Sequence, residues 1–237
     1  MTDWGTIAIG TRMNDRCDPR FFNSWSHLIA GGLRRGDTVL DAAIELPQHF
    51  AGTALALFYL RSDADTLCMV DTDMIFQPDA LERLRSDPAG YEYDILSALS
   101  VTRRKPFYPI VLKLKEENGE VKYKCAMDEI NGGIVEVDAV GTGFTLIRRS
   151  VFERMEKELS FGRWFFEFGH GGLGEDTQFC QRAKLLAQPA KIGVHTGVSI
   201  GHRGPIAFYW NVKDKKTEME SYDQCAELFA AANKKGN

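Results

Sequence analysis

Apolar and polar positions repeat with two different periods along this chain, and the change of period separates predicted strands from predicted helices. Short, nearly continuous apolar runs are typical of strands that are buried on both faces. In the first half of the chain these runs cover residues 6–10, 38–44, 67–70 and 94–99. Between them, apolar residues recur every three or four positions, as on one face of a helix. The predicted helices cover residues 19–34 and 50–61, and a further one opens at Pro78.

The second half of the chain has a different pattern. Residues 107–138 alternate between apolar and polar and contain the turn sequences EENGE and INGG, which indicate an antiparallel section. The further predicted elements are a strand at 140–147, helices at 150–158 and up to 186, a β segment at 190–202 and an amphipathic helix at 218–232. Strands that alternate with helices predict a sheet covered on both faces. We therefore expect one three-layer α/β/α domain of Rossmann-like type, with a mostly parallel central sheet and a smaller antiparallel section.

Composition excludes several classes of protein. A formal net charge of -4 gives no general basic surface for nucleic acid. The five cysteines are scattered and form no CxxC pair, so neither a zinc site nor a disulfide framework is expected. The longest apolar run, residues 51–60, is about half as long as a membrane-spanning helix. With no leader-like N-terminus, we expect a soluble, cytoplasmic protein without a membrane span.

A pair of carboxylates follows one of the buried strands, in the sequence LCMVDTD at residues 67–73. Residues two apart in a strand point to the same face, so Asp71 and Asp73 are predicted to converge on one cation. Carboxylate oxygens suit Mg²⁺ or Mn²⁺, and these ions commonly bridge substrate phosphates. The alternative is that the pair only ends a strand or caps a helix. A second such pair, Asp63 and Asp65, precedes the strand and is predicted to be a solvated turn.

Two further clusters carry candidate chemistry. Glu175 and Asp176 follow a glycine-rich loop at the start of a helix, where a carboxylate either serves as a general base or interacts with the helix dipole. His202 lies between glycines at a strand end, next to Arg203, which is suited to phosphate. An imidazole beside two carboxylates would favour Mn²⁺ over Mg²⁺. His195 is interpreted as structural, and His170 stays undecided.

Four motifs in this order resemble the GT-A-fold nucleotide-sugar glycosyltransferases, in particular family-two-like members from bacteria and phages. They are CMVDTDMIFQPDALERL, AVGTGFTLIRRSVFERM, GEDTQFCQRA and VSIGHRG. The resemblance covers most of the chain. It implies a nucleotide-binding half at about residues 1–100, an acceptor half at about 101–212 and a helical tail at 213–237. Where many members carry an Arg-Asn pair, this chain has QHFAGTALAL.

The resemblance also implies roles for individual residues. Asp73 would be the direct metal ligand, Asp71 would contact the metal or the ribose, and His202 would be the third protein ligand. Asp176 would be the catalytic base, supported by Glu175. The remaining residues implied at the donor are Thr11, Arg12 and Asp41 beside the nucleotide, Gly143 beside the donor sugar, and Arg203 at the phosphates.

The predicted reaction is metal-dependent transfer of a sugar from a nucleoside-diphosphate donor, with UDP as the default, to an acceptor hydroxyl. Inversion is favoured; in a retaining enzyme, Asp176 would only orient the acceptor. The alternatives are a sugar nucleotidyltransferase and a catalytically inactive protein that binds a sugar nucleotide or carbohydrate. The acceptor stays open between a glycan, a protein, a small molecule and a modified base in phage DNA. Arg103, Arg104 and Lys105 are either a solvated strand end or a basic patch that could approach a polyanion. Trp164, Phe165 and Phe166 are candidate acceptor contacts, although aromatics at such spacing are more often core residues.

Overall fold

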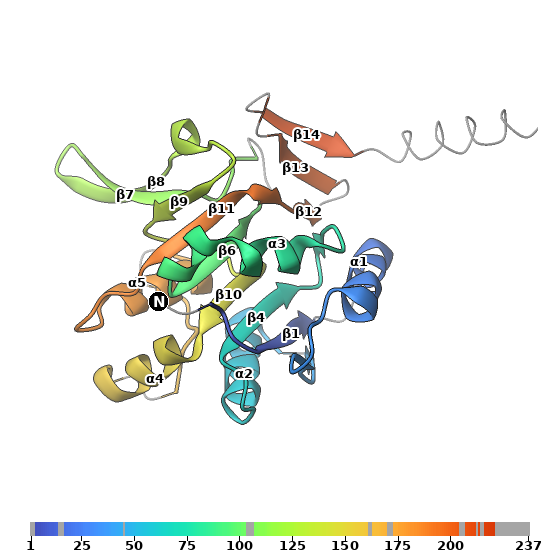
Figure 1. The fold of residues 1–237 in the computed structure, drawn as a ribbon. Helices are drawn as coiled ribbons and strands as arrows, with labels where there is room; N and C mark the ends of the chain where they lie inside the picture. The colour runs from blue at the N-terminus through green and yellow to red at the C-terminus, as the bar shows by residue number, and fades with distance from the viewer. Residues whose placement is uncertain are drawn as a thin grey trace, which may run out of the picture.

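The main sheet runs through the middle of the molecule. The computed structural model describes residues 3–13, 17–44, 46–102, 107–160, 163–169, 173–203, 207–211, 213 and 216–220. Within these residues the strand order of the sheet is β2-β1-β4-β10-β6-β11-β9, and β3 also pairs with β1 (Figure 1). The strands are β1 (Ile7–Met13), β2 (Thr38–Val39), β3 (Ala43–Ile44), β4 (Thr66–Asp71), β6 (Ile95–Leu99), β9 (Ile134–Val137), β10 (Phe144–Arg148) and β11 (Ile192–Ser199).

Pairing in this sheet is parallel among β1, β2, β3 and β4 and between β6 and β11. Strand β10 lies antiparallel between β4 and β6, and β9 adds an antiparallel edge. The expected mostly parallel central sheet is therefore confirmed. Its central strands are buried on both faces, which explains why they read as continuous apolar runs in the sequence.

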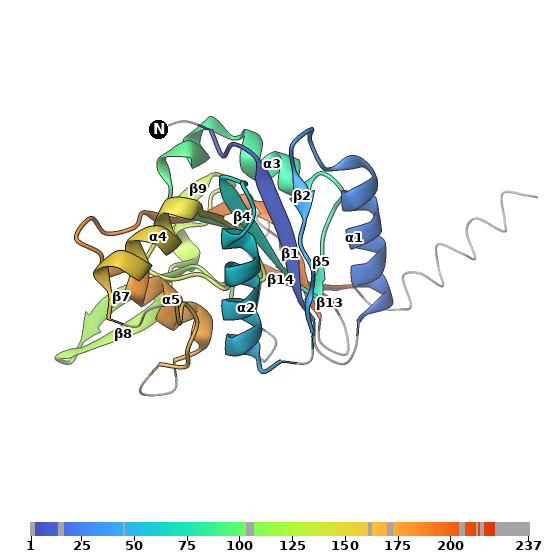
Figure 2. The same cartoon turned by 90° about the horizontal axis from the view of Figure 1, so that it is seen from below.

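Helices cover both faces of the sheet and complete the three layers (Figure 2). One face packs against α2 (Gln48–Leu60), α4 (Arg149–Glu158) and α5 (Glu175–Lys184), and the other against α1 (Pro19–Gly31) and α3 (Ala80–Ser86). Alternate residues of β4 serve the two cores. Leu67 and Met69 pack on the α2 side, whereas Cys68 and Val70 pack on the α1 side. Because successive side chains of a strand point to opposite faces, β4 contributes side chains to both hydrophobic cores.

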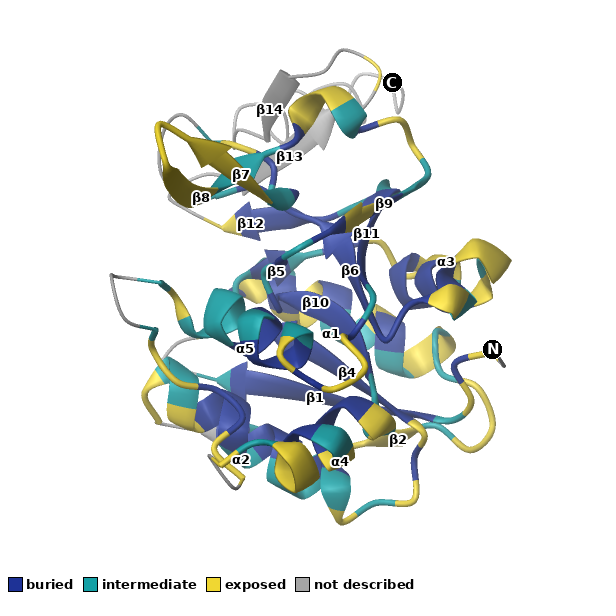
Figure 3. Cartoon of the chain, turned by 90° about the vertical axis from the view of Figure 1, so that its left-hand side faces the viewer, coloured by how far each residue is buried: buried dark blue, intermediate teal, exposed yellow. Residues whose placement is uncertain are grey.

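Two smaller sheets lie beside the main one. The first has the order β14-β13-β12-β5, from β5 (Met74–Ile75), β12 (Gly201–Arg203), β13 (Ala207–Asn211) and β14 (Lys216–Glu220). The second is the hairpin of β7 (Leu112–Glu117) and β8 (Glu120–Cys125), which is largely exposed (Figure 3). The antiparallel section predicted at 107–138 contains this hairpin and β9. Short 3-10 helices lie at Pro88–Glu92 and Met127–Glu129.

Two expectations about the elements need correction. The first predicted strand, at residues 6–10, continues through residues 11–13 as β1, because pairing with β4 and β3 extends to the end of the strand. Residues 216–220 form β14 rather than the start of the predicted helix, because they pair with β13. The rest of that predicted helix, from residue 221, lies outside the described residues. No helix in the described ranges has the length and apolar character needed to cross a membrane.

Candidate active site

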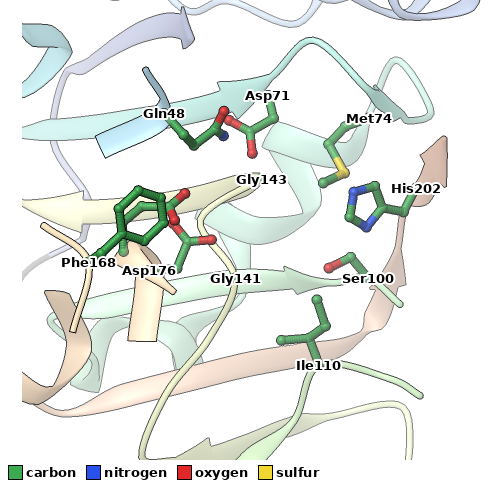
Figure 4. A pocket seen from close by; sticks show the side chains of 11 residues that line it. Gln48, Asp71, Met74, Ser100, Ile110, Gly141, Gly143, Phe168, Asp176 and His202 are labelled. Atoms are coloured by element: carbon green, nitrogen blue, oxygen red, sulfur yellow. The ribbon is translucent and has the colours of Figure 1, made fainter. Parts of the chain in front are cut away.

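The three sequence clusters meet at one cavity of about 600 Å³. It opens where β4 and β6 end and β10 begins, and where β12 and the start of α5 approach them (Figure 4). Its walls come from residues that are far apart in the sequence. The lining residues are Gln48, Asp71, Met74, Ser100, Ile110, Gly141, Gly143, Phe168, Glu175, Asp176 and His202.

Strand pairing brings His202 to Asp73. In the small sheet, His202 of β12 is the register partner of Met74 in β5, and the Arg203 backbone N–H donates to the Asp73 carbonyl at 2.8 Å. His202 Nε2 then lies 3.5 Å from Asp73 Oδ2. The other ring nitrogen, Nδ1, lies 2.6 Å from the carbonyl oxygen of Val101.

The contact with Val101 decides the state of the His202 ring. A carbonyl oxygen only accepts, so Nδ1 carries the hydrogen and donates it. Nε2 is then the nitrogen that faces the Asp73 carboxylate, and it presents either a second proton or a lone pair. A carbonyl partner that fixes the tautomer in this way is typical of histidines that bind metal through the opposite nitrogen.

Asp71, which lines the same cavity as His202, is held by Arg12. Its carboxylate takes a bidentate contact from Arg12, with Nε to Oδ1 at 2.6 Å and Nη2 to Oδ2 at 2.8 Å. The convergence of Asp71 and Asp73 on one cation stays a prediction, and strand periodicity does not by itself place Asp73, because β4 ends at Asp71 and the next two residues turn. The rule that residues two apart share a face holds only within the strand.

Arg12 and Asp71 form a buried ion pair. Burial works against the charged form of Arg12, but Asp71, Asp176 and Glu175 outweigh it and raise the arginine's pKa. Burial raises the pKa of Asp71 to about 6, and the contact with Arg12 keeps it from rising further. The bidentate contact with this charged arginine lets Asp71 anchor Arg12 at the cavity wall.

The fit to a metal ion rests on two side chains. Among the described residues there is no group of three or more His, Cys, Asp or Glu side chains placed to hold a metal. Asp73 and His202 nevertheless supply a hard oxygen and an imidazole nitrogen, the donor set that suits Mn²⁺. Ions that bind substrate phosphates use few protein ligands and take the rest from phosphate and water. The residues present fit an ion of that kind.

Asp176, at the first turn of α5, is held by two neighbours. The Thr142 backbone N–H donates to Asp176 Oδ2 at 3.2 Å, and the Thr142 hydroxyl donates to Oδ1. Arg12 Nη1 lies 3.4 Å from Oδ1, and Arg12 Nη2 also donates to the Thr142 hydroxyl at 2.9 Å. A buried arginine and a buried threonine thus fix the direction of a carboxylate that still reaches the cavity.

Glu175 lies next to this network. Its carboxylate is 3.6 Å from Arg12 Nη1 and is largely buried. Burial and then the negative charge of Asp176 raise the pKa of Glu175, although Arg12 opposes them. Adjacent carboxylates whose environments differ are common where acid–base chemistry occurs.

Of the other residues implied at the donor, Gly143 lies at the cavity, and Thr11, Asp41 and Arg203 do not line it. Thr11 is buried inside β1, and Asp41 is exposed between β2 and β3 and does not line the cavity. Gly143 lines the cavity, where a Cβ would lie 2.2 Å from Met74 Cε, so the glycine makes room for a neighbouring side chain. Arg203 Nε pairs with Asp18 Oδ2 at 2.6 Å, and Asp18 caps α1. Arg203 therefore ties α1 to β12.

Sequence patterns did not point to some of the residues at the cavity. Gln48 and Phe168 line the cavity, and the Val101 carbonyl orients His202. Gln48 stands in QHFAGTALAL, the segment that departs from the family pattern, and this departure was the available signal. His195 pairs with Asp87 at 3.1 Å, away from the cavity residues. The predicted patch at residues 103–105 and the undecided His170 lie outside the described part of the chain.

Comparison with known proteins supports the fold. No family model matches the chain, and no curated protein matches it. Among solved structures, A197 from STIV aligns with a TM-score of 0.57 and 15% identity, covering 91% of this chain and 94% of that one. A crystal structure of GalNAc-T7 with UDP, GalNAc and Mn²⁺ aligns with a TM-score of 0.55 and 9% identity, over 84% of this chain and 43% of that chain. At these identities the likeness concerns the fold, and the expected GT-A-like α/β architecture is confirmed.

Proposed function

We propose that this chain is a metal-dependent glycosyltransferase that moves a sugar from a nucleoside-diphosphate donor to an acceptor hydroxyl. One observation carries the proposal. A single cavity is lined both by His202, which faces Asp73, and by Asp176, which Thr142 and Arg12 hold in place. The volume of about 600 Å³ lies within the usual range of small-molecule sites.

Asp73 and His202 are the proposed metal ligands, and Asp71 is the anchor for Arg12. A bound Mn²⁺ or Mg²⁺ would neutralise the negative charge that grows on the leaving nucleoside diphosphate. The N–O separation of 3.5 Å suits two atoms that each contact one ion at about 2.1 Å. UDP is the proposed donor nucleotide, which agrees with the ligands that accompany the GalNAc-T7 structure.

Asp176 is the proposed general base. Its carboxylate would accept the proton of the acceptor hydroxyl as that oxygen attacks the anomeric carbon, which inverts the configuration of the sugar. Both of its oxygens have partners on one side, from Thr142 and Arg12, so the carboxylate keeps one orientation without a bound substrate. Such preorganisation lowers the cost of reaching the reactive geometry.

The four sequence motifs support placing the chain with family-two-like bacterial and phage members. The same set of residues argues against a catalytically inactive binding protein, because a binder needs no oriented base. Asp176 lies in that orientation without contributing to the buried core, since a quarter of its side chain stays accessible. An acceptor oxygen can therefore reach it.

Hydrolysis of nucleotide sugars separates an enzyme from a binder. Purified protein is incubated with UDP-, GDP- and CDP-sugars, with and without Mn²⁺, and release of the nucleoside diphosphate is measured. We expect slow hydrolysis of one donor class that needs Mn²⁺ and is lost in Asp73→Ala. The control is Asp63→Ala, which removes an exposed aspartate from the other Asp-x-Asp sequence. Binding of a donor without hydrolysis, in the wild type, would instead support a binding protein.

A further inference from the structure

A second hollow of about 420 Å³ lies on the surface, lined by His49, Phe50, Trp164 and Glu167. We call these four residues, together with the neighbouring Phe168, the aromatic shelf. The His49 and Phe50 rings are 4.2 Å apart, and Phe50 contacts Trp164 edge-on at 5.5 Å. Phe168 lies 4.8 Å from His49. The shelf is thus one connected set of rings from two segments of the chain.

The rings of the shelf remain open to solvent. The exposed fractions are 39% for Phe50, 53% for Trp164 and 57% for Phe168. Leaving large aromatic surface in water is unfavourable, and exposed apolar patches commonly mark binding sites. The two aromatic residues that follow Trp164 behave differently, because Phe165 and Phe166 are buried in the core. Of the three candidate acceptor contacts, only Trp164 is accessible.

A buried arginine fixes the Trp164 side of the shelf. Arg182 of α5, which is 2% exposed, donates to the Trp164 carbonyl and to the Glu167 carboxylate. The same helix carries Glu175 and Asp176 at its first turn. The position of the shelf is therefore coupled to that of the proposed base through one helix.

The helix α2 fixes the other side of the shelf. The Thr53 hydroxyl donates to the Phe166 carbonyl at 3.3 Å and accepts from the Phe166 N–H at 3.2 Å. Gly52 packs so closely that a Cβ there would lie 2.9 Å from the Phe166 ring. The two segments that carry the rings are held together by these contacts, so the hollow exists before any ligand arrives.

The shelf also borders the candidate active site. Gln48 and Phe168 line the main cavity, and they directly adjoin His49 and Glu167, which line the hollow. Phe168 appears beside Asp176 and Gln48 in Figure 4. A ligand that spans both spaces would pass the proposed base.

We propose that the aromatic shelf binds a pyranose ring of a glycan acceptor, next to the sugar whose hydroxyl reacts. This inference rests on the proposed function and names the acceptor class that the proposed function leaves open. The C–H faces of a pyranose pack on the flat faces of Trp164 and Phe50, and its hydroxyls can donate to the Glu167 carboxylate. Apolar walls with a few placed polar groups are typical of small-ligand subsites. Arg182 contacts one oxygen of the Glu167 carboxylate, and 58% of the Glu167 side chain stays accessible to a sugar hydroxyl.

Quenching of tryptophan fluorescence by acrylamide tests the shelf, because Trp164 is exposed whereas Trp4 is buried and Trp25 is half-buried. The emission of Trp164 is the difference between the wild type and Trp164→Ala, which keeps the other three tryptophans, Trp4, Trp25 and Trp210. The probes are chitotetraose, cellotetraose, mannotetraose and maltotetraose at millimolar concentration, with UDP as a further probe. We expect at least one oligosaccharide to protect the exposed emission in the wild type. Phe50→Ala keeps Trp164 as the reporter. In this variant the dissociation constant of the protecting oligosaccharide should rise about tenfold, as expected for loss of one aromatic contact.

Three further measurements test whether the bound oligosaccharide occupies the aromatic shelf. Leu185→Ala removes another exposed apolar side chain outside the shelf and should leave the dissociation constant unchanged. Trp164→Ala should abolish the protected emission, which identifies the reporter. Manganese-dependent donor hydrolysis by Phe50→Ala should match the wild type, so the shelf can fail while the proposed function stands. Protection by UDP alone, by none of the oligosaccharides, or only through self-association that Phe50→Ala dissolves would overturn the proposal.

Discussion

Arg12 and Asp71 occupy paired positions on adjacent parallel strands, and their side chains form a bidentate ion pair with distances of 2.6 Å and 2.8 Å. Asp71 lines the cavity, and the pair is almost completely buried. Through Arg12, the carboxylate of Asp71 is linked to Thr142 and Asp176. Strand β4, which leads into Asp71-Thr72-Asp73, thus helps to position Asp176, the proposed base, through Arg12.

Loss of Arg12 should destabilise the fold. Arg12→Ala leaves the carboxylate of Asp71 buried without its cation, which typically costs about 3–5 kcal/mol. Urea unfolding of the variant measures this change in the free energy of unfolding. Arg35→Ala, which removes an exposed arginine, is the matched control and should stay within about 0.5 kcal/mol of the wild type. An unchanged urea midpoint for Arg12→Ala would contradict the assigned ion pair.

The Thr142 hydroxyl should matter for turnover more than for donor binding. Thr142→Val keeps the shape of the side chain but removes the donor to Asp176 Oδ1. A hydrogen bond to a charged group contributes about 1.5–3 kcal/mol, so kcat should fall about tenfold or more while the KM for the donor stays similar. Thr142→Ser should restore most of the activity. A rise in donor KM with unchanged kcat would show that Thr142 acts on binding instead.

Glu175 should make stability fall as the pH rises. Its folded pKa is raised by burial and by Asp176, so the folded state holds the proton more tightly than the unfolded state. The stabilisation is present below the ordinary glutamate pKa and is lost as the pH increases through the folded pKa. Glu175→Gln cannot lose that proton. We expect its melting temperature to exceed that of the wild type at pH 8 and the difference to shrink towards pH 4.5, whereas a constant difference would exclude this cause.

The three α/β/α layers could be predicted from the sequence because the spacing of apolar residues distinguishes buried strands from helices with one buried face. Strand β4 shows the reason, since Leu67 and Met69 serve one core and Cys68 and Val70 the other. The sequence also identified the three clusters that meet at the cavity, because charged or glycine-rich segments after buried strands have few purely structural explanations.

The contacts of individual side chains could not be predicted from the sequence in the same way. Arg12 contacts Asp71, which lies 59 positions away in the sequence, and Asp176, which lies 164 positions away. A local sequence pattern cannot predict contacts between residues so far apart. Asp71 was assigned to a cation by strand periodicity, but the strand ends at that residue. Arg203 was assigned to phosphate from its charge, while its guanidinium pairs with Asp18. The carbonyl of Val101 has no side-chain signature at all.

The measurement that tests the central claim most directly is the melting temperature with UDP and Mn²⁺, each alone and both together. Asp73 and His202 should make binding of the nucleotide depend on the metal, and a ligand at 100 times its dissociation constant stabilises the fold by about 2.7 kcal/mol. We expect a joint shift in the wild type and in Asp63→Ala, and none in Asp73→Ala or His202→Ala. An equal joint shift in Asp73→Ala would contradict the account.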